Sequence, residues 1–264
     1  MMIRSVVLVG AGNVAWSMGK ALRTAGLDIL QVVNRSLLGA EALGQELGVS
    51  TTCRAEEVVR GADLYLIMVR DDAISVVSQG LPFRDGLVVH TAGSVPMQIL
   101  SAHQRHGVLY PLQTFSKSRL VDFSRVSLFV EGSTPEVCQD LCCFARQLSP
   151  MVYEAGTEQR QWLHLSAVWG ANFVNHLWGL ASDMLREHGL PTGALHLLMD
   201  ECLRKAIESE NPHRVQTGPA VRFDQQVLDK HLLLLSGDPR LEHLYRMLSQ
   251  SIQTTAYDLQ TKTS

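Results

Sequence analysis

Residues 7–15 read Val7-Leu8-Val9-Gly10-Ala11-Gly12-Asn13-Val14-Ala15, so the pattern G-x-G-x-x-A directly follows an apolar run. Gly10 permits a tight turn out of a strand, Gly12 lets the backbone approach a pyrophosphate, and Ala15 lets the next helix pack closely on the strand. The first turn of that helix offers free N–H groups and a partial positive charge to phosphates. The residues expected to contact a bound dinucleotide are Gly10, Gly12, Asn13, Val14 and Ala15. The alternative is a tight strand-to-helix turn that binds no ligand.

The end of the next apolar run indicates which nucleotide would bind. Proteins that prefer NAD usually carry an acidic residue here, which binds the ribose hydroxyls, whereas this chain reads Asn34-Arg35-Ser36. Arg35 can pair with a 2′-phosphate, and Asn34 and Ser36 can donate hydrogen bonds to it. The pattern favours NADP over NAD; the alternative is that Arg35 is an exposed loop arginine without a ligand.

The carboxyl ends of later strands in such a sheet line the same crevice. They place a further set of residues at the cofactor: Met68, Val69, Thr91, Gly93 and Ser94. Asp71 and Asp72 also follow one of these runs. We expect one of these two carboxylates to cap the helix that begins at Ala73.

The first part of the chain alternates short apolar runs, with little polar alternation, and stretches that can form helices. The expected strands are Ser5–Val9, Ile29–Asn34, Leu64–Val69, Leu87–His90, Gly107–Tyr110, Arg125–Val130 and Met151–Glu154. The expected helices are Val14–Ala25, Leu38–Leu47, Ala73–Gln79 and Thr134–Leu148, the last with Thr134 as N-cap and Pro135 at the first helical position. This rhythm predicts an α/β fold over residues 1–155, a Rossmann doubly wound parallel sheet.

Residues 156–264 lack the strand signal and predict an all-α C-terminal domain. The expected helices are Gln159–His188, Gly193–Ser209, Arg222–Leu235 and Asp238–Leu259. The first of them is apolar on more than one face between Leu163 and Leu180, and it carries Trp162, Trp169 and Trp178. A helix of this kind is usually buried on several sides. We therefore expect a homodimer formed through the C-terminal domain.

Composition limits the classes of function. The net charge of −3 gives no general attraction to nucleic acid or to an anionic membrane surface. No apolar run is long enough to span a membrane, and the N-terminus lacks the parts of a signal peptide, so a cytoplasmic location is expected. The five cysteines include no C-x-x-C pair, and Cys138 and Cys142 lie one helical turn apart. Neither a disulfide framework nor a metal site is expected.

With these motifs in place, the first ~95 residues resemble the cofactor domain of pyrroline-5-carboxylate reductases and deazaflavin-dependent NADP reductases. The whole chain resembles a family of NADP oxidoreductases with a C-terminal domain of unknown function. The matching segments are Gly10–Ala15, Asn34–Ser36, Val88–Ser94, Tyr110–Phe115, His164–Asn175 and Thr217–Ala220. The resemblance implies NADP(H) and a helical, dimer-forming second domain, but no substrate. Relatives in the hydroxyacid-dehydrogenase branch carry a catalytic lysine that the stretch Gln161–Ala167 lacks, and His164 is its nearest replacement.

Candidate catalytic residues lie on the first expected helix of the second domain. His164, Val168, Asn172 and Asn175 recur at spacings of four, four and three, so they would share one face of a regular helix. His164 could then act as acid or base beside amides that hold a substrate; the alternative is a core histidine with structural asparagines. His90 is the rival acid or base, unless it anchors its turn through backbone hydrogen bonds. The other residues expected at the substrate pocket are Tyr110, Gln113, Thr217 and Arg222.

These features predict an NADP(H)-dependent oxidoreductase that transfers hydride to or from a small C=O or C=N compound. One alternative is a non-catalytic NADP(H)-binding module that senses redox state, because the chain has no catalytic lysine and two competing histidines. Another is exchange of hydride with a deazaflavin. Turnover of a carbonyl or imine panel would support the first, and a tight, substrate-independent NADPH complex that alters a partner interaction would support the second.

Overall fold

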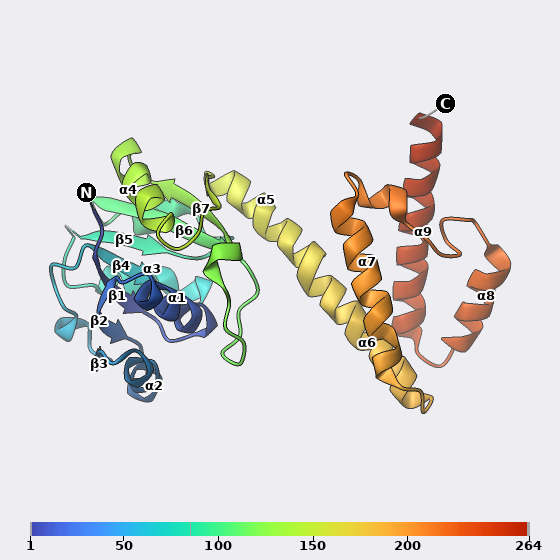
Figure 1. The fold of residues 1–264 in the computed structure, drawn as a ribbon, viewed down its shortest axis with the longest axis horizontal. Coiled ribbons are helices and arrows are strands. Elements are labelled where there is room, and N and C mark those ends of the chain that lie inside the picture. The colour runs from blue at the N-terminus through green and yellow to red at the C-terminus, as the bar shows by residue number, and fades with distance from the viewer. Residues whose placement is uncertain (1, 85, 263–264) are drawn as a thin grey trace. The chain divides into compact units, whose positions relative to one another are not determined.

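The computed structural model describes residues 2–84 and 86–262 (Figure 1). The chain divides into two compact units, Met1–Leu177 and Trp178–Ser264. This division falls later than the boundary expected at residue 155, because the helix that starts at Thr157 is bound to the first unit by buried polar contacts. The assignment of the second domain to substrate binding and dimerisation stays a prediction.

The first unit is built on one eight-stranded sheet with the order β3-β2-β1-β4-β5-β6-β7-β8. The strands are β1 (Ser5–Val9), β2 (Asp28–Val33), β3 (Ser50–Thr52), β4 (Leu64–Ile67), β5 (Leu87–His90), β6 (Arg105–Leu112), β7 (Ser127–Gly132) and β8 (Val152–Glu154). Neighbouring strands are parallel except for β6 and β7. The Rossmann-like α/β fold predicted from the sequence is therefore confirmed.

Two features of the sheet differ from the expectation. The polar strand β3 carries no apolar run and was not predicted. The pair β6–β7 is antiparallel, with Tyr110 opposite Phe129. The connection between these strands holds only the short 3-10 helix Phe123–Arg125. A parallel crossover usually contains a full helix, whereas an antiparallel pair does not need one.

Helices cover both faces of the sheet. The helices of the first unit are α1 (Asn13–Thr24), α2 (Leu37–Leu47), α3 (Ile74–Gly80), α4 (Pro135–Ala145) and α5 (Thr157–Ala167). One apolar cluster joins α1, α2 and α4 to one face, and the other joins α3 to the opposite face. Alternate residues of β1 divide between them, with Leu8 in the first cluster and Val7 in the second. Burial of both faces explains why these strands read as continuous apolar runs.

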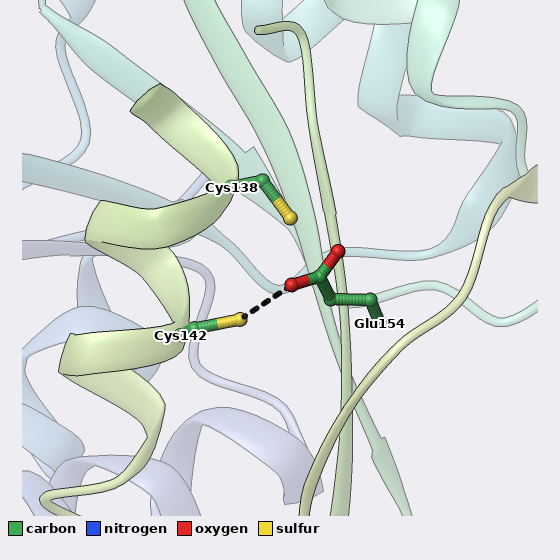
Figure 2. Close-up of side chains that lie close together, drawn as sticks. All are labelled: Cys138, Cys142 and Glu154. Carbon is green, nitrogen blue, oxygen red and sulfur yellow. Dashed lines mark hydrogen bonds between the residues drawn. The ribbon is translucent and has the colours of Figure 1, made fainter. Parts of the chain in front are cut away.

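Helix α4 begins as predicted. The Thr134 side chain accepts a hydrogen bond of 3.3 Å from the Val137 N–H, and Pro135 occupies the first helical position. Cys138 and Cys142 share the face of α4 that points toward Glu154 of β8 (Figure 2). Burial raises the pKa of the Cys138 thiol to about 11, and it also raises the pKa of Cys142. Thiols with a raised pKa are poor nucleophiles, so a reactive cysteine is not indicated here.

The long helix expected over residues 159–188 is continuous but not regular. It consists of α5, a π-helical segment (Val168–Phe173) and α6 (Val174–Glu187), and it ends before Gly189, whose φ is +69°. The second unit continues with α7 (His196–Glu208), α8 (Gln225–Leu234) and α9 (Pro239–Lys262), which confirms a helical C-terminal region. Among the described residues, no helix is long and apolar enough to cross a membrane.

Candidate functional site

The turn between β1 and α1 has the geometry of a phosphate cradle. Gly10 has a φ of +124°, and a Cβ there would lie 2.2 Å from the carbonyl oxygen of Met68, so only glycine fits. A Cβ on Gly12 would meet nothing within 4 Å, so the space in front of this residue is open. No side chain caps the first turn of α1, and no acidic residue lies in it. The free N–H groups of this turn fit the phosphates of the expected dinucleotide.

The carboxyl end of β2 presents one free cation. Arg35 is exposed and forms no ion pair or hydrogen bond with any other residue in the described ranges 2–84 and 86–262. Its neighbours have structural contacts of their own: Asn34 Nδ2 donates to the Ser36 carbonyl at 3.0 Å, and Ser36 Oγ accepts from the Gly39 N–H at 3.4 Å. Ser36 thereby caps α2, while its hydroxyl proton stays available. Arg35 is thus the group best able to pair with a 2′-phosphate.

His90 ends β5 as a fully buried side chain. Its Nδ1 accepts a hydrogen bond of 3.2 Å from the Ala92 N–H. Burial lowers the pKa of His90 to about 4, and the nearby charge of Arg160 acts in the same direction. The imidazole is therefore neutral at pH 7 and shielded from solvent. Of the two roles that the sequence left open, these contacts favour the anchoring of the turn over proton transfer.

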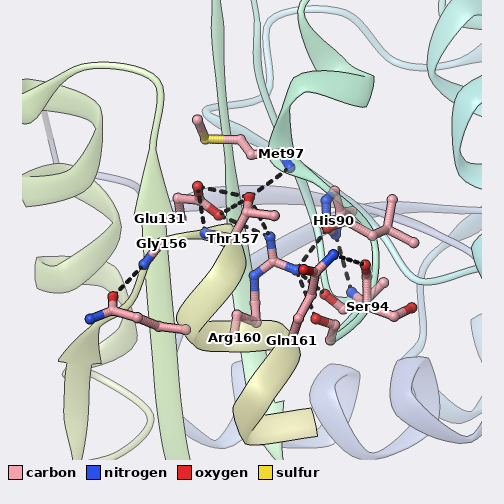
Figure 3. Close-up of polar contacts among 12 residues, drawn as sticks. His90, Ser94, Met97, Glu131, Gly156, Thr157, Arg160 and Gln161 are labelled. Atoms are coloured by element: carbon pink, nitrogen blue, oxygen red, sulfur yellow. Dashed lines mark hydrogen bonds and ion pairs between the residues drawn. The ribbon is translucent and has the colours of Figure 1, made fainter. Parts of the chain in front are cut away.

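Arg160 of α5 binds that turn from the other side (Figure 3). Its side chain is buried, and Nη1 donates to three backbone carbonyls of one turn: Ala92 at 2.9 Å, Gly93 at 3.0 Å and Val95 at 2.7 Å. The amide of Gln161 adds a hydrogen bond of 3.0 Å to the Ser94 carbonyl. The start of α5 is therefore joined to residues 92–95 by charge-assisted bonds, which are stronger than neutral ones.

Glu131 of β7 balances the charge of Arg160. Its Oε2 lies 2.9 Å from Arg160 Nη2, and its carboxylate also accepts from the Thr157 N–H and hydroxyl, each at 3.0 Å. Neither charged residue was predicted from the sequence. Arg160 reads as an ordinary exposed residue near a helix start, and no local pattern shows that its partner lies 29 positions away.

His164 lies one turn further along α5. Its Nδ1 is 3.0 Å from the Tyr110 hydroxyl, and the two rings meet edge to face with centroids 5.9 Å apart. A Cβ on Gly93 would lie 2.6 Å from Cγ and Nδ1 of His164, so the glycine makes room for the ring. No residue of the described ranges hydrogen-bonds to Nε2. His164 is thus held beside the turn after β5 with one nitrogen free.

Tyr110 supports this arrangement from β6. The side chain is buried, and burial raises the pKa of its hydroxyl, with Arg160 acting in the opposite direction. The hydroxyl therefore stays protonated at neutral pH. Since a phenol can both donate and accept, it can hold Nδ1 of His164 in either protonation state. The structure brings together two residues that the sequence assigned separately to catalysis and to the pocket wall.

A π-helical segment interrupts the regular helix on which the catalytic face was expected. A π turn contains one more residue than an α turn, so Asn175, which follows the segment, is rotated from its regular-helix position, whereas Asn172 lies within the segment. Asn172 and Asn175 are exposed, whereas Ala171 and Val174, one position earlier, are partly buried. The spacing of a regular helix therefore no longer gives the positions of these asparagines relative to His164, and their place on one face with it stays a prediction. Their contact with a substrate stays a prediction.

The remaining expected residues have different positions. Ser94 donates a hydrogen bond from its hydroxyl to the Asp71 carboxylate, and Asp72 pairs with Arg70 at 3.0 Å. Neither Asp71 nor Asp72 caps α3, whose N-cap is Ala73, so that expectation is wrong. Asp71 instead joins the end of β4 to the turn after β5.

The pocket-wall residues outside β6 are all exposed. Gln113 follows β6, and its amide oxygen accepts from the Thr114 N–H at 2.8 Å. Thr217 and Arg222 belong to the second unit. The structure shows no contact that tests these three residues as pocket residues, so their assignment stays a prediction.

Comparison with known proteins matches both parts of the chain. Residues 5–93 match the family described as NADP oxidoreductase, coenzyme F420-dependent, and residues 126–252 match a domain of unknown function, DUF2520. A candidate NADP oxidoreductase from Bacteroides fragilis is 40% identical, with a TM-score of 0.88 over 96% of this chain and 98% of its own. The chain belongs to the same family as this protein. NADP(H) is accordingly the cofactor of the family, as the sequence predicted.

More distant solved structures share the fold. A pyrroline-5-carboxylate reductase from Coxiella burnetii is 20% identical, with a TM-score of 0.58 over 96% of this chain and 97% of its own. A reductive aminase from Aspergillus terreus, in complex with cyclohexanone and allyl amine, is 12% identical, with a TM-score of 0.67 over 97% of this chain and 95% of its own. No curated protein matches the chain.

Proposed function

We propose that this protein is an NADP(H)-dependent reductase that acts on a small C=N or C=O compound, with His164 as the proton-transferring residue. One observation carries the proposal: His164 is held against Gly93 in the turn after β5, and its Nε2 is free. In an open α/β sheet, ligands bind outside the carboxyl ends of the strands, which is where this turn lies. The distant likeness to a pyrroline-5-carboxylate reductase and to a reductive aminase supports the choice of substrate class.

Different residues of this chain would bind different parts of NADP(H). The N–H groups of the first turn of α1 bind the phosphates, and Arg35 pairs with the 2′-phosphate that distinguishes NADP(H) from NAD(H). The turn that follows His90 orients the nicotinamide end, because Arg160 and His90 fix its backbone from two sides. When bound, NADPH supplies the hydride.

His164 and Tyr110 handle the proton. With Nδ1–H donating to the Tyr110 hydroxyl, His164 can release a proton from Nε2 toward the nitrogen or oxygen of a substrate. After the transfer, the neutral ring keeps its Nδ1–H bond to the same oxygen, so the ring does not have to reorient. Tyr110 is thus a positioning residue that acts through His164.

The test is oxidation of NADPH, followed by absorbance, with a panel of small imines and carbonyl compounds. On the substrate found, His164→Gln should lower kcat by roughly 10²- to 10⁴-fold, the usual contribution of a positioned acid. Tyr110→Phe should lower kcat by about fivefold, since one neutral hydrogen bond contributes about 1 kcal/mol. His176→Gln, which changes an exposed histidine of α6, is the control and should leave kcat unchanged.

Three outcomes would overturn the proposal. Equal losses for His164→Gln and His176→Gln would remove His164 from the chemistry. NADPH binding without turnover of any panel member would favour the redox-sensing module instead. Rapid reduction of a deazaflavin by NADPH, with no imine or carbonyl turnover, would favour hydride exchange between two nucleotide-like cofactors.

We also propose that the protein acts as a homodimer. Large apolar side chains are exposed on the chain, including Trp162 and Trp169 in the first unit and Leu197 and Leu234 in the second. Large exposed apolar side chains are typical of interfaces, and a second copy of this chain is the occupant that the long apolar helix predicts. Light scattering at micromolar concentration tests this, and a monomer would refute it. The cytoplasmic location stays a prediction.

A further inference from the structure

Three metal-ligating side chains lie together on α4 and β8, in contacts separate from those of the nucleotide turn and of His164. One ligand atom from each of Cys138, Cys142 and Glu154 lies within 4.8 Å of the other two (Figure 2). The Cys142 thiol is 3.9 Å from Glu154 Oε1. Cys142 is buried, Cys138 is partly buried and Glu154 is exposed, so the group opens to solvent on one side.

Packing fixes the backbone that carries these ligands. A Cβ on Gly132 of β7 would lie 2.3 Å from the backbone nitrogen of Cys138, so the first turn of α4 rests directly on β7. Strand β8 pairs with β7 so that Val130 lies opposite Glu154, and the rings of Phe129 and Tyr153 stack at 5.4 Å one position earlier. The backbone positions of the three ligand residues are therefore set by the packing of α4 and β8 on β7 and not by loops.

The spacing fits a tetrahedral thiophilic cation. Zinc–sulfur bonds of about 2.3 Å and zinc–oxygen bonds of about 2.0–2.2 Å place neighbouring ligand atoms roughly 3.5–3.8 Å apart. The three ligand atoms need to move inward by no more than about 1 Å, which side-chain rotation provides. Two thiolates select Zn²⁺ over Mg²⁺ or Ca²⁺, which prefer oxygen ligands. The solvent-facing side leaves the fourth position to water.

We propose that Cys138, Cys142 and Glu154 bind one Zn²⁺ ion that ties α4 to β8, an edge strand of the sheet. On binding, each thiol loses its proton to solvent and each sulfur forms a bond to the metal, with no change of oxidation state. Two thiolates and one carboxylate leave a net charge of −1 around the ion, and Arg146 of the same region lies near Cys142. The sequence predicted no metal site because two cysteines one turn apart supply only two ligands, and the sheet brings the third.

The test uses the full chain, reduced and stripped with a chelator, and Co²⁺ as the probe. We expect one Co²⁺ per chain, with the thiolate-to-cobalt charge-transfer band and the visible bands of tetrahedral Co²⁺, and full displacement by Zn²⁺. Cys138→Ser and Cys142→Ser should each weaken binding by roughly 100-fold or more, and Glu154→Gln by roughly tenfold or more, since loss of outer contacts alone costs 10- to 100-fold. Cys143→Ser, an exposed neighbour on the same helix region, is the matched control and should change affinity less than about twofold.

A second measurement guards against misfolded variants. Zn²⁺ should raise the midpoint of thermal unfolding of the wild type and of Cys143→Ser, and this rise should vanish in Glu154→Gln, whose exposed side chain is not needed for packing. The proposal fails if the reduced protein takes up no Co²⁺. It also fails if all three ligand variants take up Co²⁺ as the wild type does, because exposed histidines would then be the binding groups. Neither result depends on NADPH binding, so the metal proposal can fail without affecting the proposed reductase activity.

Discussion

Arg160 is the buried cation that joins α5 to the turn after β5, and replacing it tests whether this joint supports both fold and site. In Arg160→Gln, the Glu131 carboxylate loses its guanidinium partner, and the carbonyls of Ala92, Gly93 and Val95 lose their donor. The two side chains are only 1% and 14% exposed, so water does not readily replace these bonds. Breaking a buried ion pair by removing one partner costs about 3–5 kcal/mol.

Calorimetry measures this loss of unfolding free energy as a fall in the unfolding temperature, Tm. For a chain of this size, 1 kcal/mol lowers Tm by roughly 2–4 °C, so the unfolding transition of the first unit should fall by roughly 6–20 °C. The control Arg60→Gln removes an exposed arginine and should cost less than about 0.5 kcal/mol. The double variant with Glu131→Gln should lose less than the sum of the two single losses, because it removes both charges together.

Activity gives a second readout on the same variant. If the joint positions His164, a displacement of the ring by about 1 Å should lower kcat on the order of 10²-fold at a temperature where the variant is fully folded. A Tm and a kcat that match those of Arg60→Gln would refute the reasoning, since the buried pair would then contribute neither stability nor alignment. A lower Tm with normal kcat would limit Arg160 to the fold.

Three further substitutions test separate parts of the site. Arg35→Ala should weaken NADPH binding by roughly 10- to 100-fold in calorimetric titration and leave NADH unchanged, since it removes one charge-assisted contact; equal losses would contradict the assignment. Gly93→Ala places a Cβ 2.6 Å from the His164 ring and should lower kcat on the order of 10²-fold, and an unchanged kcat would contradict the contact. His90 has a pKa of about 4 when folded, against 6.5 in the unfolded chain, so the unfolded state binds more protons between these values. The wild type should therefore lose about 3 kcal/mol of unfolding free energy as pH falls from 6.5 to 4 in urea titrations; His90→Asn should lose about that much less, and parallel pH profiles would exclude this cause.

The parts of the fold that the sequence predicted are those with local causes. The G-x-G-x-x-A turn needs glycine at position 10, because φ is +124° there and a Cβ would lie 2.2 Å from the Met68 carbonyl oxygen, and the short motif marks this need within a few residues. Apolar runs identified seven strands because both faces of the sheet are buried. Strand β3 was missed because Ser50–Thr52 is polar and pairs only at the edge next to β2. The antiparallel pair β6–β7 and the π-helical segment leave no clear periodic signal, so neither could be predicted.

The sequence predicted only the part of the candidate site that short motifs mark. Residues that act through their own backbone, such as Gly10 and Gly12, carry a motif. Arg160 and Glu131 act through each other across 29 positions, and Asp71 binds Ser94 across 23. Such pairs depend on which strands become neighbours, and motifs and periodicity along one chain do not reveal that.

The choice between the two histidines depends on burial, which spacing does not reveal. His90 and His164 both belong to segments that the sequence placed near the nicotinamide, but one ring is fully buried and neutral at pH 7 while the other is partly exposed with a free Nε2. The buried ring and Arg160 hold the same short turn from opposite sides, and Gly93 in that turn admits His164. A rigid turn is what a proton donor needs beside it, because a catalytic group is effective only when its position is fixed within about 0.5 Å. If His164 is the proton donor, as proposed, His90 and Arg160 should affect the reaction indirectly, because they hold the turn against which His164 is positioned.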